Sequence, residues 1–330
     1  MGRNSVKEPL SIAFCHRLMP LFRGVPPIDN VVLQESGCQV ITLTDGPLDL
    51  KAHEILWISG NANWFPKICR QLAGRSRAER PFTVIWHEEP LPPPRASGLP
   101  WPRLYLREIA KIVLRDPRIT DVYSNYWRLR SLARQGIPDL LAVTTRNRWE
   151  FLAERGIASH WVPMGYASHH GGDLNLQRDL DVIFLGTLTV PRRNRVIRRL
   201  RRRGVSLLTL GSWSDPRCWG ESRNRLLNRT RIFLNIHRFP GELSGDRMIL
   251  GMANKTLVIS EPIYHPDQFI PGQHYVSATA EEMPETIEYY LAHDEERRQI
   301  AEEGHRLVTR EVTMARSIAR ILELIKTHVG

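Results

Sequence analysis

The segment HRFPGELSGDRMILGMANKTLVISEP, residues His237–Pro262, joins a glycine-bounded acidic loop, a short amphipathic helix and an apolar strand within 26 residues. The helix is expected to begin at Ser244 or Gly245, because serine is a good N-cap and Asp246 in the first turn favours the helix dipole. Its apolar face consists of Met248, Ile249 and Met252. A loop, a helix and then a buried strand make the repeating unit of a parallel α/β sheet.

The same alternation runs through most of the chain. Near-continuous apolar runs without period-two alternation predict parallel strands that are covered on both faces. In the first half the predicted strands are Leu10–His16, Cys38–Thr44, Glu54–Gly60, Phe82–Pro90, Asp121–Asn125, Leu140–Thr145 and His160–Tyr166. In the second half they are Asp181–Gly186, Val205–Gly211, Arg231–His237, Thr256–Pro262 and His274–Ala278.

These repeats predict an α/β protein with two doubly wound Rossmann-like domains that face one another across a cleft. The polar, glycine-bearing segment Ala167–Asp179 is interpreted as the linker. The first domain is therefore expected to cover residues 1–170 and the second residues 178–330. A helical tail after Glu281 is expected to pack across both domains.

The charge of the chain is concentrated in one segment. Residues Arg178–Arg238 contain 15 arginines and four acidic residues, which accounts for the whole net charge of +11. A local surplus of this kind indicates an anionic ligand or surface.

The chain has no apolar run of the roughly 18 residues that a membrane span needs. It also begins without the apolar stretch of a signal peptide, so a cytoplasmic location is expected. The four cysteines are widely separated and show no metal-binding spacing.

Several familiar motifs are absent. No G-x-G-x-x-G follows a predicted strand, and there is no P-loop, H-E-x-x-H or nucleophile elbow. These absences favour a fold that holds a diphosphate with scattered side chains and helix N-termini.

The predicted strand ends of the second domain fit that idea. Gly186 and Thr187 follow one strand, and the next helix is entered through Arg192 and Arg193. Gly211 ends the following strand. Arginine beside a helix N-terminus suits a pyrophosphate, because it adds donors to the exposed backbone N–H groups.

The opening segment offers a second candidate of this type. A phosphate could occupy the helix N-terminus at Ser244 and Gly245, with Arg247 supplying charge, while Glu242 accepts hydrogen bonds from sugar hydroxyls. Alternatively, Glu242, Asp246 and Arg247 form a capped, ion-paired surface turn. The sequence allows both the phosphate site and the ion-paired surface turn.

The arginines of the run Arg198–Arg203 lie too far into the predicted helix to share one phosphate. They are interpreted as a solvated basic face, with contact to an anionic membrane or a polyanionic acceptor as the alternative.

The stretch from Asp181 to Ala278 resembles the donor-binding half of GT-B glycosyltransferases of the group 1 type. It is most similar to the branch with spore-maturation-type and "glycosyl transferases group 1" proteins. There a strand ending in LN.H is followed by an acidic loop, an Arg-bearing helix and a strand ending in SE. The resemblance implies donor binding by His237, Glu242, Ser244, Gly245, Asp246 and Arg247.

One position departs from that pattern. The family carries two glutamates separated by seven residues, and the second one contacts the ribose of the nucleotide. Glu242 could be the first, but Leu250 stands eight positions later. The resemblance therefore leaves the ribose contact unassigned.

In the first half, the resemblance implies that His87, just past a predicted strand end, touches the donor sugar. Glu88 or Glu89 could then orient or deprotonate an acceptor hydroxyl. The competing base is His16, after the first predicted strand, where Gly24 lies in the same loop. A structural role for a histidine at a strand end is the alternative.

The resemblance thus predicts a glycosyltransferase that moves a sugar from a nucleotide diphosphate sugar to a hydroxyl acceptor without a metal or another cofactor. The acceptor could be a glycan, a lipid-linked group or a small molecule, and peripheral contact with an anionic inner membrane face is an additional expectation. No nucleic-acid partner is expected. The alternatives are a nucleic-acid-binding or nucleic-acid-modifying protein, a catalytically silent GT-B module, and a nucleotide-sugar epimerase.

Overall fold

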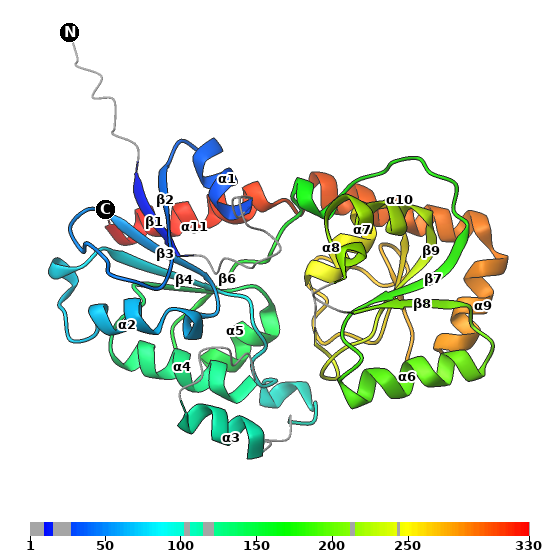
Figure 1. The fold of residues 1–330 in the computed structure, drawn as a ribbon, viewed down its shortest axis with the longest axis horizontal. Helices are drawn as coiled ribbons and strands as arrows, with labels where there is room; N and C mark the ends of the chain where they lie inside the picture. Colours follow the sequence, from blue (N-terminus) through cyan, green and yellow to red (C-terminus); the bar gives the residue numbers. More distant parts are fainter. Residues whose placement is uncertain are drawn as a thin grey trace, which may run out of the picture. The chain divides into compact units, whose positions relative to one another are not determined.

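The computed structural model describes residues 10–15, 28–101, 106–114, 122–211, 215–242 and 245–329. Contacts divide the chain into two compact units. Unit 1 contains the chain up to Val162 together with the part from Ile318 onward, and unit 2 is Pro163–Ser317. Figure 1 shows that each unit is a sheet with helices packed on its two sides.

Unit 1 is built on a six-stranded sheet in the order β2-β1-β3-β4-β5-β6, and every adjacent pair is parallel. Its strands are β1 (Ser11–Cys15), β2 (Gln39–Leu43), β3 (Ile55–Gly60), β4 (Phe82–His87), β5 (Leu140–Val143) and β6 (His160–Trp161). Its helices are α1 (Ile28–Glu35), α2 (Pro66–Leu72), α3 (Leu106–Val113), α4 (Val122–Arg134) and α5 (Arg146–Ala153). Every residue of the central strands β3 and β4 is buried, which explains their unbroken apolar sequences.

Unit 2 contains a five-stranded parallel sheet in the order β11-β10-β9-β7-β8. Its strands are β7 (Leu180–Leu185), β8 (Leu207–Leu210), β9 (Thr230–Asn235), β10 (Leu257–Ser260) and β11 (Val276–Ser277). Its helices are α6 (Pro191–Arg202), α7 (Gly220–Arg229), α8 (Gly245–Ala253), α9 (Met283–Ala292) and α10 (Asp294–Arg310). The last helix, α11 (Met314–Val329), belongs mostly to unit 1.

The two faces of the unit 2 sheet bury separate apolar clusters. Ile183, Phe233 and Val258 belong to the cluster that includes apolar residues of α8 and α10. Their neighbours in sequence belong to the cluster on the other face, which includes residues of α6 and α9. Alternate residues of each strand therefore pack on opposite layers of helices, and the predicted fold class of two doubly wound parallel sheets is confirmed.

One predicted strand is wrong. The residues expected as the strand Asp121–Asn125 instead begin helix α4, as far as they are described. Val122, Asn125, Leu129 and Leu132 are buried at helical spacing, so the burial pattern of this segment has a period near 3.6.

The expected linker Ala167–Asp179 is held by unit 2. It contains the 3-10 turn η5 (Ser168–His170). The side-chain amide of Asn254 donates to the carbonyl oxygen of His170 at 2.8 Å, and that of Asn228 donates to Gly172 at 2.9 Å. Within the described ranges, no helix combines the length and the apolar character that crossing a membrane requires.

Candidate functional site

The carboxyl ends of β7, β8, β9 and β10 share one edge of the unit 2 sheet, because these strands are parallel. Gly186 follows β7 and Gly211 follows β8, and the N–H of Gly186 donates to the carbonyl oxygen of Leu210 at 2.7 Å. A Cβ on Gly211 would lie 2.2 Å from the carbonyl oxygen of Gly186. The two glycines therefore pack backbone to backbone at this edge. Thr187 comes next, with its hydroxyl 2.9 Å from that of Thr189.

Two arginines from different helices converge on this edge. Arg193 in the first turn of α6 donates through Nε to the carbonyl oxygen of Ile236 at 3.0 Å. Arg247 in the first turn of α8 donates to the same oxygen at 3.1 Å. Their guanidinium carbons lie 5.9 and 5.4 Å from the centroid of the Phe184 ring. The backbone after β9 and one aromatic ring thus hold both cations in place.

The electrostatics of this pair favour an anion. Burial, followed by the charge of Arg247, lowers the pKa of Arg193 to about 9, while Glu242 acts in the opposite direction. Burial also lowers the pKa of Arg247, opposed by Glu242 and Asp246. A bound diphosphate would relieve the repulsion between the two guanidinium groups and supply acceptors for their donors.

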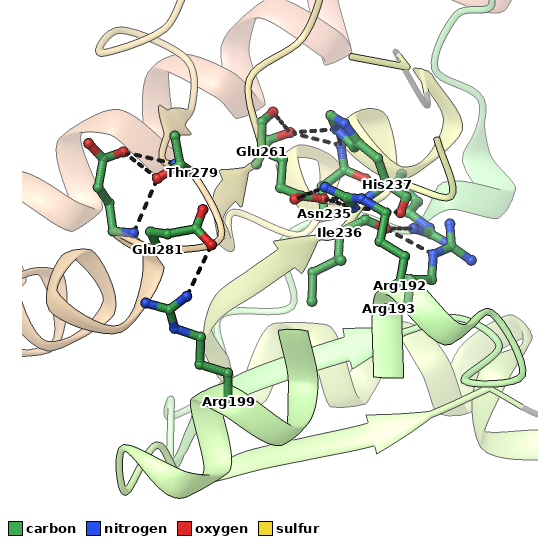
Figure 2. Close-up of polar contacts among 12 residues, drawn as sticks. Arg192, Arg193, Arg199, Asn235, Ile236, His237, Glu261, Thr279 and Glu281 are labelled. Atoms are coloured by element: carbon green, nitrogen blue, oxygen red, sulfur yellow. Dashed lines mark hydrogen bonds and ion pairs between the residues drawn. The ribbon is translucent and has the colours of Figure 1, made fainter. Parts of the chain in front are cut away.

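A third arginine is fixed by a buried carboxylate, as Figure 2 shows. Arg192 donates from both terminal nitrogens to Glu261, with one separation of 2.7 Å, and to the carbonyl oxygen of His237 at 3.1 Å. Glu261 also accepts the backbone N–H of His237 at 2.8 Å. Because this carboxylate is almost fully buried, it ties the start of α6 to the ends of β9 and β10.

His237 lies buried among these arginines. Burial, followed by the charges of Arg192, Arg247 and Arg193, lowers the pKa of its imidazole to about 3. The ring is therefore neutral at physiological pH.

The N-terminus of α8 is clamped by a histidine from η5. The Nε2 of buried His170 lies 3.1 Å from Oδ1 of Asp246. Burial raises the pKa of Asp246, but the hydrogen bond from His170, together with the charge of Arg223, outweighs it and lowers the pKa. Gly245 begins the helix, whereas Ser244 lies outside the described residues. The carboxylate of Asp246 is thus paired with His170 of the same chain.

The same place holds a candidate metal site. Among the described residues, His169, His170 and Asp246 offer ligand atoms within 4.8 Å of one another. Burial, then the neighbouring His170, lowers the pKa of His169 to about 4, so its imidazole is neutral. The direct hydrogen bond between His170 and Asp246 accounts for the arrangement without an ion.

The basic face of α6 is partly neutralised by α9 and the loop before it. Arg199 lies 3.0 Å from Glu281, and Arg203 lies 3.6 Å from Glu285. Arg201 donates to the hydroxyl of Thr209 at 2.9 Å. These contacts fit the reading of a solvated helix face.

The candidates of the first half lie in unit 1. His87 ends β4 and is fully buried. Burial, followed by the charge of Arg148, lowers its pKa to about 3, against the opposing effect of the Gly60 and Glu89 backbone. Glu88 accepts a hydrogen bond from the hydroxyl of Ser59 at 3.1 Å. The competing candidates His16 and Gly24 lie outside the described residues.

The sequence did not indicate several residues that form the site at the carboxyl-end edge of the unit 2 sheet, which we call the strand-edge site. They are Phe184, Asn235, the carbonyl of Ile236, Ser260 and Glu261. The sequence signal that could have identified them is their position, because residues at the carboxyl ends of parallel strands lie at the same edge of the sheet. Leu250, which stands in place of the family's ribose-binding glutamate, is 5% exposed and belongs to the apolar core.

Comparison with known families gives one match. Residues 192–323 match the family described as "Glycosyl transferase-like". The matched region contains Arg192, Arg193 and Arg247. A search of curated protein sequences found no significant match.

Solved structures with the same fold include sucrose-phosphate synthase from Thermosynechococcus elongatus, with a TM-score of 0.58 and 14% identity over 96% of this chain and 98% of that one. HepE from Anabaena has a TM-score of 0.58 and 10% identity over 96% of this chain and all of HepE. TarM from S. aureus has a TM-score of 0.57 and 10% identity over 82% of this chain. The chain spans only about half of TarM, namely 54%.

The fold is that of GT-B glycosyltransferases, and the family match identifies the second half of the chain as glycosyl transferase-like. The match of residues 192–323 to a glycosyl transferase-like family agrees with the group 1 resemblance that the sequence indicated.

Proposed function

We propose that this glycosyltransferase takes its sugar from a uridine diphosphate sugar and that the strand edge of unit 2 binds the diphosphate. The observation that carries the proposal is the convergence of Arg193 and Arg247 on the carbonyl oxygen of Ile236. Uridine is proposed because structures of HepE contain UDP and UDP-glucose, and a structure of TarM contains UDP.

The arginines would act mainly on the leaving group. Transfer of the sugar breaks the bond to the β-phosphate and leaves a negative charge on the nucleoside diphosphate. Guanidinium groups that are already held in place stabilise this charge without having to reorganise. The N-terminus of α8 would add backbone N–H groups and its dipole.

The acceptor is proposed to be a hydroxyl group, since the TarM structure contains α-GlcNAc-glycerol. His87 is proposed to contact the donor sugar, and Glu88 to orient or deprotonate the acceptor. Because arginines and helix dipoles supply the positive charge, transfer is proposed to need no metal.

A thermal-shift screen of UDP-, GDP-, ADP- and dTDP-sugars tests the donor assignment, repeated with Arg247→Ala. The matched control is Arg225→Ala, which removes an exposed arginine of α7 that pairs with Glu221. We expect uridine nucleotides to raise the Tm of the wild type and of the control but not of Arg247→Ala. Failure of every nucleotide to stabilise the wild type would contradict the proposed function.

Metal independence is tested with the stabilising donor in a turnover assay that measures UDP release. Activity is expected to be equal in EDTA and in added Mg²⁺ or Mn²⁺. Complete loss in EDTA with recovery on adding a divalent cation would contradict metal-independent transfer.

Contact with an anionic membrane through α6 is a separate proposal. Arg195, Arg198 and Arg202 are exposed on this helix. Anionic vesicles should bind the wild type more tightly than the variant carrying Arg195→Glu, Arg198→Glu and Arg202→Glu. Equal affinity of the wild type and the variant for anionic vesicles would contradict membrane contact through α6.

A further inference from the structure

A buried polar cluster lies at the ends of β9 and β10, beside the arginines. It consists of Asn235, His237 and Ser260, whose side chains are at most 2% exposed. The amide nitrogen of Asn235 donates to Oγ of Ser260 at 3.0 Å, and Nε2 of His237 lies 3.2 Å from the same oxygen. The cluster therefore centres on the Ser260 hydroxyl.

These contacts favour the tautomer of His237 in which Nε2 carries the proton. The hydroxyl of Ser260 donates its single proton to the carbonyl oxygen of Glu261 at 2.8 Å. Its oxygen then accepts from both neighbours, which favours Nε2 of His237 as the donor, although the amide nitrogen of Asn235 also lies 3.4 Å from Nε2. In the neutral imidazole, Nδ1 is left with a lone pair.

Two acceptors in this cluster have no partner. Among the described residues, neither Nδ1 of His237 nor Oδ1 of Asn235 has a hydrogen bond, although both atoms are buried. Leaving such atoms unpaired is unfavourable, so each of them needs a partner such as a water molecule, an ion or a bound ligand.

We propose that Nδ1 of His237 and Oδ1 of Asn235 accept hydrogen bonds from hydroxyl groups of the bound nucleotide sugar. The inference rests on the proposed function. Phosphate oxygens cannot serve here, because they are acceptors themselves, whereas ribose and hexose hydroxyls donate. Ser260 is a positioning residue that holds the imidazole in the accepting tautomer.

The test compares the dissociation constants of ligands that differ by one hydroxyl group. Calorimetry with UDP, 2′-deoxy-UDP and 3′-deoxy-UDP probes the ribose. UDP-glucose and UDP-2-deoxyglucose probe the sugar. Loss of the hydroxyl that donates to His237 should weaken binding to the wild type roughly tenfold, as expected for one buried hydrogen bond.

Two conservative variants separate this role from a structural one. His237→Asn places an amide near the position of Nδ1, and His237→Gln places it near Nε2. We expect His237→Asn to retain part of the preference for the hydroxyl-bearing ligand and His237→Gln to lose it. A purely structural role would lower the Tm of both variants without changing the preference of either for the hydroxyl.

The outcomes are distinct. If UDP and UDP-glucose do not bind the wild type, the proposed function fails and this inference fails with it. If they bind but every deoxy analogue binds equally well, or if His237→Gln keeps the full preference, only the inference is overturned, and ordered water is the partner of the two acceptors.

Discussion

The guanidinium group of Arg247 lies directly against the backbone of Gly186. A Cβ built on Gly186 would stand 2.6 Å from a terminal nitrogen of Arg247. Arg247 is also anchored to the carbonyl oxygen of Ile236 at 3.1 Å. The end of β7 therefore leaves space for an arginine that comes from α8, and the two elements together shape the anion site.

Replacing Gly186 with alanine should displace Arg247 and weaken UDP binding by about tenfold, because one charge-assisted hydrogen bond to phosphate is lost. The nearest group is the end of a flexible side chain, but Gly186 has a φ of 157° and a Cβ there would also lie 3.0 Å from the Phe184 ring, so the Tm should fall as well. Calorimetric titration of UDP measures the effect. Gly172→Ala is the matched control, because nothing lies within 4 Å of a Cβ there. Unchanged affinity in Gly186→Ala would show that Arg247 does not contact the ligand.

The pair formed by Arg192 and Glu261 should be strongly coupled. Glu261 is 4% exposed at the side chain, so removing Arg192 leaves a buried carboxylate without its main partner. A double-mutant cycle with Arg192→Ala and Glu261→Ala should give a coupling energy of about 2 kcal/mol in urea unfolding. The exposed pair Arg203 and Glu285, 3.6 Å apart, should give less than about 0.5 kcal/mol. Equal coupling energies for the two pairs would refute this ranking.

Stability should fall as the pH is lowered below about 6.5. The pKa of His87 and that of His237 are each about 3 in the folded protein, against an ordinary value of 6.5. The unfolded chain therefore binds protons between these values while the folded protein does not, so the free energy of unfolding decreases toward low pH. Linkage predicts a loss of about 2 kcal/mol per histidine between about pH 7.5 and pH 5.

Urea unfolding across this pH range checks the effect. His237→Asn should reduce the pH dependence by roughly the share of one histidine. A stability that is constant from pH 7.5 to pH 5 would be incompatible with two buried neutral imidazoles.

Restoring the family's glutamate at position 250 should not restore a ribose contact. Leu250 is 5% exposed and packs in the apolar core of unit 2. Leu250→Glu should therefore lower the free energy of unfolding by about 3 kcal/mol or more, because a carboxylate is buried without a partner. Thermal unfolding and UDP titration measure both consequences. A variant with wild-type stability and tighter UDP binding would mean that position 250 does face the ligand.

The sequence predicted the fold well because the signal is local. Fully buried parallel strands such as Ile55–Gly60 and Phe82–His87 have unbroken apolar runs, and these are visible without structural information. The failure at Val122–Asn125 has the same origin. Four residues of a buried helix start look like a short strand until the spacing to Leu129 and Leu132 is considered.

The site was predictable only in part, because its geometry depends on contacts between distant residues. Arg193 and Arg247 were found from their positions at the starts of helices. Their shared acceptor, the carbonyl of Ile236, carries no sequence signature. Glu261 is another example, since its partner Arg192 lies 69 positions away. Asp246 was expected at the ligand, but its partner His170 comes from a segment that was interpreted as a linker.

The most direct test of the strand-edge site is a calorimetric titration of UDP into the wild type and into the double variant Arg193→Ala with Arg247→Ala. Both arginines donate to the carbonyl oxygen of Ile236 and flank the ring of Phe184, so they form one site. The wild type should bind UDP, and the double variant should bind it at least 100-fold more weakly, by roughly 3 kcal/mol or more. A double variant that remains folded and binds UDP with the wild-type dissociation constant would place the nucleotide elsewhere and contradict the account.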